Sequence, residues 1–479
     1  MKVIKNYFYN LSYQILSLIV PLITSAYVSR TLRPAGVGAN AFTGSIIQYF
    51  VLLANMGIGY YANRQIAYVR ENKDKLSKTF WEIQILKTVM TLIAYVCFEV
   101  FIMFYTKQSG YMWAQSLNLV AVAFDISWFY DGLENFKITV LKNSLVKLLS
   151  TAAIFIWIKG PNDVIIYILI LAISTLLGNL TLWPDVFKDT VHVKANLLNP
   201  WRHFLPMVEL FIPQIAIQVY VQLNRTMLGV MVNEKASGYY QYSDNLVKLL
   251  ISFATASGAV MLPHVANAVA HGNMDSVNRM LYKSFDFISA IAYPMTFGLA
   301  AISLTLAPKY YGAGYGPVGL AMMIESIIIL MIAWSNAIGV QYLLPLNKNK
   351  EFTISVTLGA IVNIILNFPL IKLWGLNGAM LATVASEVSV TLYQLWVIRK
   401  MVNYKDLFHN NLKYCISSLL IFIVVFTINR NTADTWLMMF IEVMVGAVIY
   451  LVMLYVLKVS IITDIKEIIM KRFRNRKAQ

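Results

Sequence analysis

Long apolar segments dominate the chain and decide what it can fold into. About 20 helical residues are needed to cross a hydrocarbon core of roughly 30 Å, and the segments reach this order of length. None alternates strictly as the strands of a membrane barrel do, so helices are the remaining way to satisfy the backbone in lipid. We predict spans at residues 8–29, 37–62, 83–105, 112–130, 144–159, 163–183, 207–229, 238–262, 285–306, 317–344, 353–373, 376–398, 412–429 and 434–457.

The composition supports the same fold class. The 479-residue chain is 58% hydrophobic and only 13% charged, which lies far outside the range of soluble globular proteins. We therefore predict an all-α polytopic membrane protein with about 14 transmembrane helices. Lys2 and Lys5 precede the first apolar run as in a signal peptide, but no small-residue cleavage site follows it, so we expect a retained helix.

The basic residues predict the orientation. Most of the 39 lysines and arginines fall in alternate connections, among them 63–82, 131–147 and 184–206, and in the segment after residue 457. By the positive-inside rule both termini are expected in the cytoplasm. The net charge of +16 then reflects topology and contact with anionic lipid, and nucleic-acid binding is not needed to explain it. The tail Lys471 to Lys477 is interpreted in the same way, as lipid contact rather than an RNA-binding patch.

The motifs of several enzyme classes are absent from the sequence. There is no phosphate-binding loop of the form GxxxxGK[ST], no HExxH and no GxSxG. Cys97 and Cys415 lie in or beside spans and cannot form a metal site or a disulfide framework. The predicted outside turns are short, which argues against a membrane polymerase or glycosyltransferase. We expect no enzymatic activity and no cofactor.

An internal repeat relates the two halves of the chain. Arg30-Thr31 matches Arg225-Thr226 at an offset of 195 residues, and further pairs follow in the same order at offsets of 200 and 205. These later pairs are Gly38 and Gly238, Phe42 and Tyr242, Gln48 and Lys248, Arg64 and His264, and the segments 76–80 and 281–285. Six spans separate the copies, so the halves are expected to be parallel repeats, an arrangement found in alternating-access transporters.

The repeat predicts the domain organisation. Residues 1–189 are expected to form an N-terminal six-helix lobe, 190–205 a cytoplasmic linker, and 206–400 a second six-helix lobe. Residues 401–479 add two helices and a basic cytoplasmic tail.

Five longer motifs follow one another over roughly residues 1–400: SRTLRPAGVGANAF, GIGYYANRQIA, LNRTMLGVMVNEKASGYYQYSDNL, LPHVANAV and GAIVNIILNFPLIKLWGLNGAMLATVASE. Taken in this order they resemble a known family, the polysaccharide-flippase branch of the multidrug, oligosaccharidyl-lipid and polysaccharide exporter superfamily. The resemblance implies two lobes forming a V around a central cleft, and export of an undecaprenyl-pyrophosphate-linked sugar repeat unit. Related sequences often carry aspartate before the arginine of the seventh helix, where this chain has Asn224.

The repeated cations are the candidate substrate-binding residues. Arg30 and Arg225 occupy equivalent positions near the expected outer ends of their helices, and arginine can hold a pyrophosphate bidentately. Lys248, deep in its span, and the pair Arg64 and His264 at the expected cytoplasmic ends extend this set into a ladder of cations. For Arg30 and Arg225 the alternative is a side chain that snorkels to the headgroups, and for Arg64 and His264 it is the ordinary positive-inside bias.

Two lysines within spans have structural alternatives. Lys248 lies one helical turn after Asp244 and could simply pair with it. Asp244 is also the candidate carboxylate for coupling an ion. Lys87, near the start of its span, is expected to snorkel. Other carboxylates in or near spans, including Asp125 and Asp131, could each pair with a cation or face the cleft.

The predicted function is a flippase that moves undecaprenyl-pyrophosphate-linked oligosaccharides to the outer leaflet of the cytoplasmic (inner) cell membrane. Its expected partners are this lipid, membrane lipids, and the polysaccharide polymerase and export machinery. A cation-coupled multidrug exporter of the same fold is the first alternative, but its coupling would use a carboxylate in the first helix, and the first acidic residue here is Glu71. A membrane polymerase is the second alternative.

Overall fold

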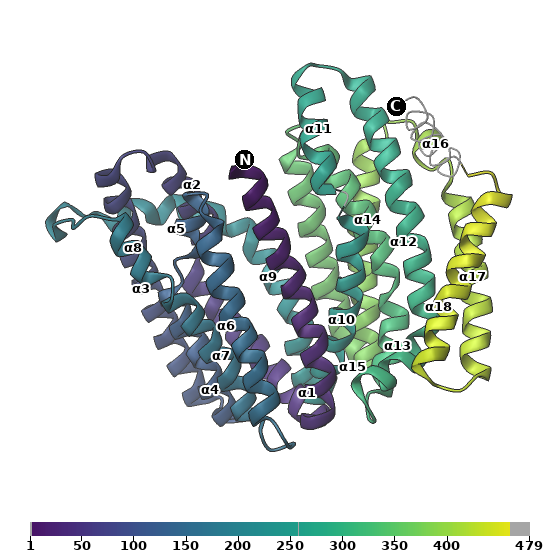
Figure 1. The fold of residues 1–479 in the computed structure, drawn as a ribbon, viewed down its shortest axis with the longest axis horizontal. Coiled ribbons are helices and arrows are strands. Elements are labelled where there is room, and N and C mark those ends of the chain that lie inside the picture. The colour runs from purple at the N-terminus through teal and green to yellow at the C-terminus, as the bar shows by residue number, and fades with distance from the viewer. Residues whose placement is uncertain (1, 257, 460–479) are drawn as a thin grey trace, which may run out of the picture. The chain divides into compact units, whose positions relative to one another are not determined.

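The computed structural model describes residues 2–256 and 258–459. Within them the chain divides into two compact units, residues 1–238 and 239–479 (Figure 1). The predicted lobe boundary at 190–205 stays a prediction, since this division falls later in the chain, inside a helix. The predicted tail after residue 459 lies outside the described residues.

Helices form nearly all of the first unit. They are α1 (Lys2–Asn55), α2 (Ile58–Val69), α3 (Lys73–Phe104), α4 (Ser109–Phe124), α5 (Ser127–Gly132), α6 (Phe136–Trp157), α7 (Val164–Leu180), α8 (Trp183–Asp189), η1 (Ala195–Leu197), η2 (Pro200–His203) and α9 (Phe204–Met231). The next helix, α10 (Glu234–Thr255), contains the boundary between the units.

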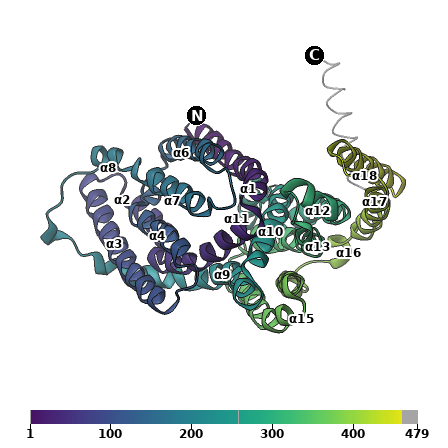
Figure 2. The same ribbon diagram turned by 90° about the horizontal axis from the view of Figure 1, so that it is seen from below.

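The second unit is built in the same way. It continues with α11 (Gly258–Ala270), α12 (Met274–Tyr311), α13 (Gly316–Glu325), α14 (Ile327–Ser335), η3 (Asn336–Leu343), α15 (Asn349–Ile398), α16 (Tyr404–Leu407), α17 (Asn411–Asn431) and α18 (Trp436–Val456). The last two helices, α17 and α18, pack together, and α17 lies along α12 (Figures 1 and 2).

Each of the fourteen predicted spans falls mainly on helix, and no strand occurs in the described part of the chain. Nine helical stretches there are long and apolar enough to cross a membrane, and two of them hold a pair of predicted spans each. The all-α polytopic fold is thus confirmed. α1 contains a break at Arg33, with φ 59°, where Pro34 begins a new helical segment, and α15 contains one at Gly375, with φ 55°.

The helix bounds repeat along the chain as the motifs do. α1 ends at Asn55 and α2 begins at Ile58, while α10 ends at Thr255 and α11 begins at Gly258, which is an offset of 200 residues at both places. The following helices, α3 and α12, each begin directly after an asparagine whose side chain accepts a hydrogen bond from the third backbone N–H onward. The two halves therefore break and restart their helices in matching places.

One connection differs from its prediction. Residues 131–147 were expected to be cytoplasmic, but α6 begins at Phe136, so Lys147 lies in the middle of a helix that is long and apolar enough to span the membrane. The predicted span 144–159 already included the second part of α6, and only its first two turns, from Phe136, were missed. Lysines lower the hydropathy there, although lysine is a good helix former.

Candidate functional site

A polar cavity of about 480 Å³ lies inside the first unit. α1, α2, α3, α5, α9 and the α4–α5 connection supply its lining. The polar lining consists of the amides Gln48, Asn55, Asn63, Gln218 and Gln222, the hydroxyl and indole groups of Tyr49, Tyr60, Ser127 and Trp128, and the charged residues Lys87, Asp125 and Asp131. A cavity of this size and polarity among membrane-spanning helices is a candidate ligand site.

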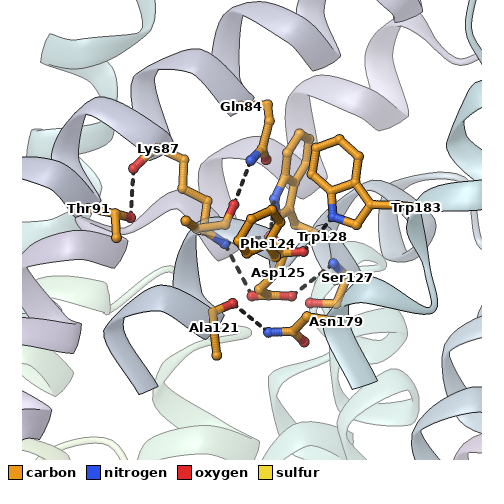
Figure 3. A network of polar contacts seen from close by, with 11 residues as sticks. Gln84, Lys87, Thr91, Ala121, Phe124, Asp125, Ser127, Trp128, Asn179 and Trp183 are labelled. Carbon is orange, nitrogen blue, oxygen red and sulfur yellow. Dashed lines mark hydrogen bonds and ion pairs between the residues drawn. The ribbon is translucent and has the colours of Figure 1, made fainter. Parts of the chain in front are cut away.

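A buried ion pair forms one wall of the cavity. Lys87 Nζ lies 3.2 Å from Asp125 Oδ2 and donates to the Asp125 backbone oxygen at 2.6 Å (Figure 3). The Lys87 side chain is 1% exposed and that of Asp125 is 32% exposed. The aspartate therefore faces the cavity, while the lysine is enclosed behind it.

The end of α4 holds Asp125 in place. Its Oδ1 accepts a hydrogen bond from the Ser127 backbone N–H at 3.0 Å, and its backbone oxygen accepts from Trp128 Nε1 at 3.2 Å. Three backbone carbonyl groups in the last turn of α4 are bonded by side chains of other helices (Figure 3). Gln84 donates to Ala123, Trp183 to Phe124 and Asn179 to Ala121. These hydrogen bonds hold the end of α4, and with it the Asp125 carboxylate, in a fixed position.

The expectation that Lys87 snorkels is wrong. Its side chain is enclosed because α3 packs against α4, which places Asp125 within reach of the ammonium group. A charged side chain inside a membrane span is expected to pair with an opposite charge. Asp125 was one of the carboxylates predicted in or near a span, so this expectation could have suggested it as the partner of Lys87.

Three of the predicted substrate-binding cations belong to the first unit. Arg30 lies on α1, three residues before the break at Arg33, and Arg64 lies on α2; both are exposed. Arg225 lies on α9 and is partly exposed, and its backbone oxygen accepts a hydrogen bond from Ser237 Oγ. None of the three is among the described residues that line the cavity. Their substrate role stays a prediction.

The remaining predicted site residues belong to the second unit. Lys248 Nζ lies 2.9 Å from Asp244 Oδ2, so these two residues are brought together as the one-turn spacing allowed. The Asp244 side chain is 4% exposed and that of Lys248 is 48% exposed. This ion pair is the structural alternative to a substrate-binding role for Lys248. His264 is exposed on α11, and its substrate role stays a prediction.

A second polar cluster anchors the segment before α9 to α3. The fully buried Glu82 accepts hydrogen bonds from the Asn199 backbone N–H at 2.8 Å, and its Oε2 lies 3.0 Å from His203 Nε2. Tyr61 of α2 lies 2.7 Å from the other ring nitrogen of His203. Burial lowers the pKa of His203, despite the opposing effect of Glu82. The cluster joins α2, α3 and the start of α9 at one end of the unit.

No metal site is formed within residues 2–256 and 258–459, where no three His, Cys, Asp or Glu side chains are grouped to hold an ion. The arrangement offers hydrogen bonding, fixed charge and aromatic faces. These groups can bind and release a polar ligand.

Comparisons with known proteins give a family and a fold. The family described as "Polysaccharide biosynthesis protein" matches residues 3–269. A provisionally named O-antigen transporter of Escherichia coli (strain K12) is 24% identical over 386 residues, which cover 80% of this chain and 93% of that relative.

Two solved structures share the fold. One is "Lipid II flippase MurJ, inward closed conformation", with a TM-score of 0.77 and 16% identity, covering 95% of this chain and 100% of that one. The other is an inward-facing multidrug resistance MATE family transporter of the MOP superfamily, with a TM-score of 0.63 and 13% identity, covering 81% of this chain and 94% of that one. Identities this low support similarity of fold alone.

Proposed function

The chain belongs to the polysaccharide biosynthesis protein family, and from this premise we propose that it is a flippase for lipid-linked oligosaccharides. The substrate is an undecaprenyl-pyrophosphate-linked repeat unit, moved from the cytoplasmic to the outer leaflet for capsule, exopolysaccharide or O-antigen synthesis. The protein acts as a transporter and catalyses no covalent step. Its polymerase and export partners act on the unit after it has crossed.

The observation that carries the proposal is the polar cavity in the first unit. Its five amide side chains each offer both donors and acceptors, which matches the mixed hydrogen-bonding character of sugar hydroxyls. Tyr49, Tyr60 and Trp128 add aromatic surface for the apolar faces of sugar rings. Lys87 and Asp125 neutralise each other's charge, so the cavity wall that they form can contact a neutral sugar.

The predicted cations complete the proposal. Arg30 and Arg225 bind the pyrophosphate, with Lys248, Arg64 and His264 along its path, while the polyprenyl chain stays in lipid. Both termini lie in the cytoplasm, and the membrane is the cytoplasmic (inner) membrane. Asp244 is the carboxylate that couples an ion if an ion gradient is required.

The experiment measures flipping in proteoliposomes loaded with the lipid-linked oligosaccharide. Replacing Arg30 or Arg225 with lysine keeps the charge and loses the bidentate geometry, so transport should fall partially, whereas alanine should abolish it. Each variant must be present in the membrane at wild-type level. Wild-type transport by both alanine variants would leave headgroup contact as the role of these arginines.

The drug-exporter alternative is tested in the same vesicles. The shared MATE fold leaves this alternative open, while the absence of any acidic residue before Glu71 argues against it. A fluorescent cationic drug should not move outward under a proton or sodium gradient. Drug efflux without oligosaccharide flipping would reverse the assignment.

A further inference from the structure

The polar cavity of the first unit has more negative than positive charge in its lining. Three carboxylates lie between α4 and α6, namely Asp125, Asp131 and Glu134. Asp125 pairs with Lys87 at 3.2 Å, and Glu134 pairs with Arg70 at 2.8 Å. The Asp131 side chain makes no hydrogen bond or ion pair with any residue that the structure describes. Because Asp131 lines the cavity together with the Lys87–Asp125 pair, its charge is left over there.

The short helix α5 fixes Asp131 at the cavity wall. The residue before it, Tyr130, is fully buried, and its hydroxyl group donates to the Leu182 backbone oxygen at 2.9 Å. The residue after it, Gly132, lies against Ile66 of α2 without room for a Cβ atom. Asp131 itself is partly exposed and lines the cavity. Since both neighbours are held by packing, the carboxylate has little freedom to turn away from the cavity.

The surroundings of Asp131 favour a cationic ligand. Its interacting charge is the Asp125 carboxylate, which is a like charge, and burial opposes its ionised form as well. A bound cation would offset both effects. An ionisable side chain in a cavity between membrane-spanning helices is by default a candidate for a functional role. The uncompensated carboxylate therefore marks where a positive group of a ligand would bind.

The rest of the lining indicates which kind of cation fits. A cavity of about 480 Å³ is in the volume range of small-molecule sites and is far larger than a metal ion requires. The described residues also contain no group of three His, Cys, Asp or Glu side chains that could hold a metal ion. The rings of Tyr49, Tyr60 and Trp128 can attract an ammonium group, and the amides can bind hydroxyl groups. This combination fits a sugar that carries an ammonium group.

We propose that the cavity binds an amino sugar of the repeat unit, with Asp131 holding its ammonium group. The inference rests on the proposed function, because it names the class of sugar that the flippase carries. A uronic acid would bring a second negative charge to Asp131, so acidic sugars are disfavoured. Asp131 thus determines specificity for the sugar, whereas the pyrophosphate is the ligand of the predicted arginines, which are not among the described lining residues.

The test is a binding titration of the purified full chain by saturation-transfer NMR at neutral pH. The probes are the methyl glycosides of 6-amino-6-deoxyglucose, glucose and glucuronic acid, which carry an ammonium, a hydroxyl and a carboxylate group on carbon 6. Wild-type protein should bind the amino sugar about tenfold more tightly than the glucoside, the gain expected for one charge-assisted hydrogen bond. The glucuronide should bind most weakly. Equal affinity for all three probes overturns the proposal.

Three variants assign the preference to Asp131. Asp131→Asn should bind the amino sugar no better than the glucoside, and unchanged affinity for the glucoside shows that the cavity is intact. Asp131→Glu keeps the charge and should keep the preference. The matched control is Glu134→Gln, which removes a carboxylate of the same connection that is not among the described lining residues, and it should bind as the wild type does. Retention of the preference by Asp131→Asn overturns the proposal.

Two further measurements separate the alternatives. Displacement of the amino sugar by an equal concentration of sodium chloride would identify an inorganic cation as the occupant and would also overturn the proposal. If wild-type protein prefers the amino sugar but flips no lipid-linked oligosaccharide, the flippase function fails and the amino-sugar site stands. If it flips the oligosaccharide but shows no preference for the ammonium group, the amino-sugar site fails and the flippase function stands.

Discussion

Removing the carboxylate of Asp125 should destabilise the first unit more than removing the ammonium group of Lys87. In Asp125→Asn the lysine keeps a charge at 1% exposure and loses its counter-ion at 3.2 Å. Breaking a buried pair in this way costs about 3–5 kcal/mol, whereas an exposed pair contributes about 0.2–1 kcal/mol. Because Asp125 is 32% exposed and the backbone acceptor at 2.6 Å remains, we expect a loss of about 2–3 kcal/mol.

The opposite change should be milder. In Lys87→Met the apolar stem still packs, and Asp125 keeps its bond from the Ser127 N–H and faces the cavity, so the loss should be about 1 kcal/mol. The double variant leaves no unpaired charge and should resemble Lys87→Met. The double-mutant cycle should therefore give a coupling of about 2 kcal/mol.

The assay is reversible unfolding in mixed micelles, followed by tryptophan fluorescence, with Trp128 and Trp183 next to the pair (Figure 3). Glu134→Gln is the control, because it breaks an Arg70–Glu134 pair whose side chains are 39% and 58% exposed; it should cost less than about 1 kcal/mol. Additive effects of the two single variants, or a larger loss for Lys87→Met than for Asp125→Asn, would refute the reasoning.

Three further expectations concern topology, energy and packing. In a variant lacking Cys97 and Cys415, cysteines at 72 and 403 should be shielded from an impermeant thiol reagent in intact cells, while cysteines at 109 and 313 should react; the reverse pattern would invert the orientation. A pyrophosphate diester carries about two charges, so an inside-negative potential of about 100 mV favours outward flipping by roughly 4–5 kcal/mol. A potassium-valinomycin potential should then drive flipping without a sodium or pH gradient, and a strict need for such a gradient would instead implicate a carboxylate such as Asp244. Gly378→Ala should lose about 1–3 kcal/mol in the same unfolding assay, because its Cβ would clash with the Leu370 backbone oxygen. Gly298→Ala, with open space around it, should not destabilise the protein, and equal effects of the two changes would contradict the packing argument.

The membrane-spanning fold could be predicted from the sequence because lipid leaves the backbone few choices. An apolar run of about 20 residues must be helical wherever it crosses the hydrocarbon core, so every predicted span falls mainly on helix. The internal repeat could also be recognised from the sequence. Duplicated segments keep their turn residues and helix starts, and the structure shows matching breaks after Asn55 and Thr255.

The polar sites depended on tertiary structure. Lys87 and Asp125 are 38 residues apart, and only the packing of α3 against α4 decides that they meet and that the aspartate faces the cavity. By contrast, Lys248 and Asp244 are four residues apart on one helix, so their pairing could be listed in advance as an alternative. Lys147 shows the same limit, since it lies where the predicted connection 131–147 and the predicted span 144–159 overlap, and only the packing of α6 against α7 places it in a polar groove between them. Helical spacing fixes which residues share a face, but the partner of that face depends on how helices distant in sequence pack together.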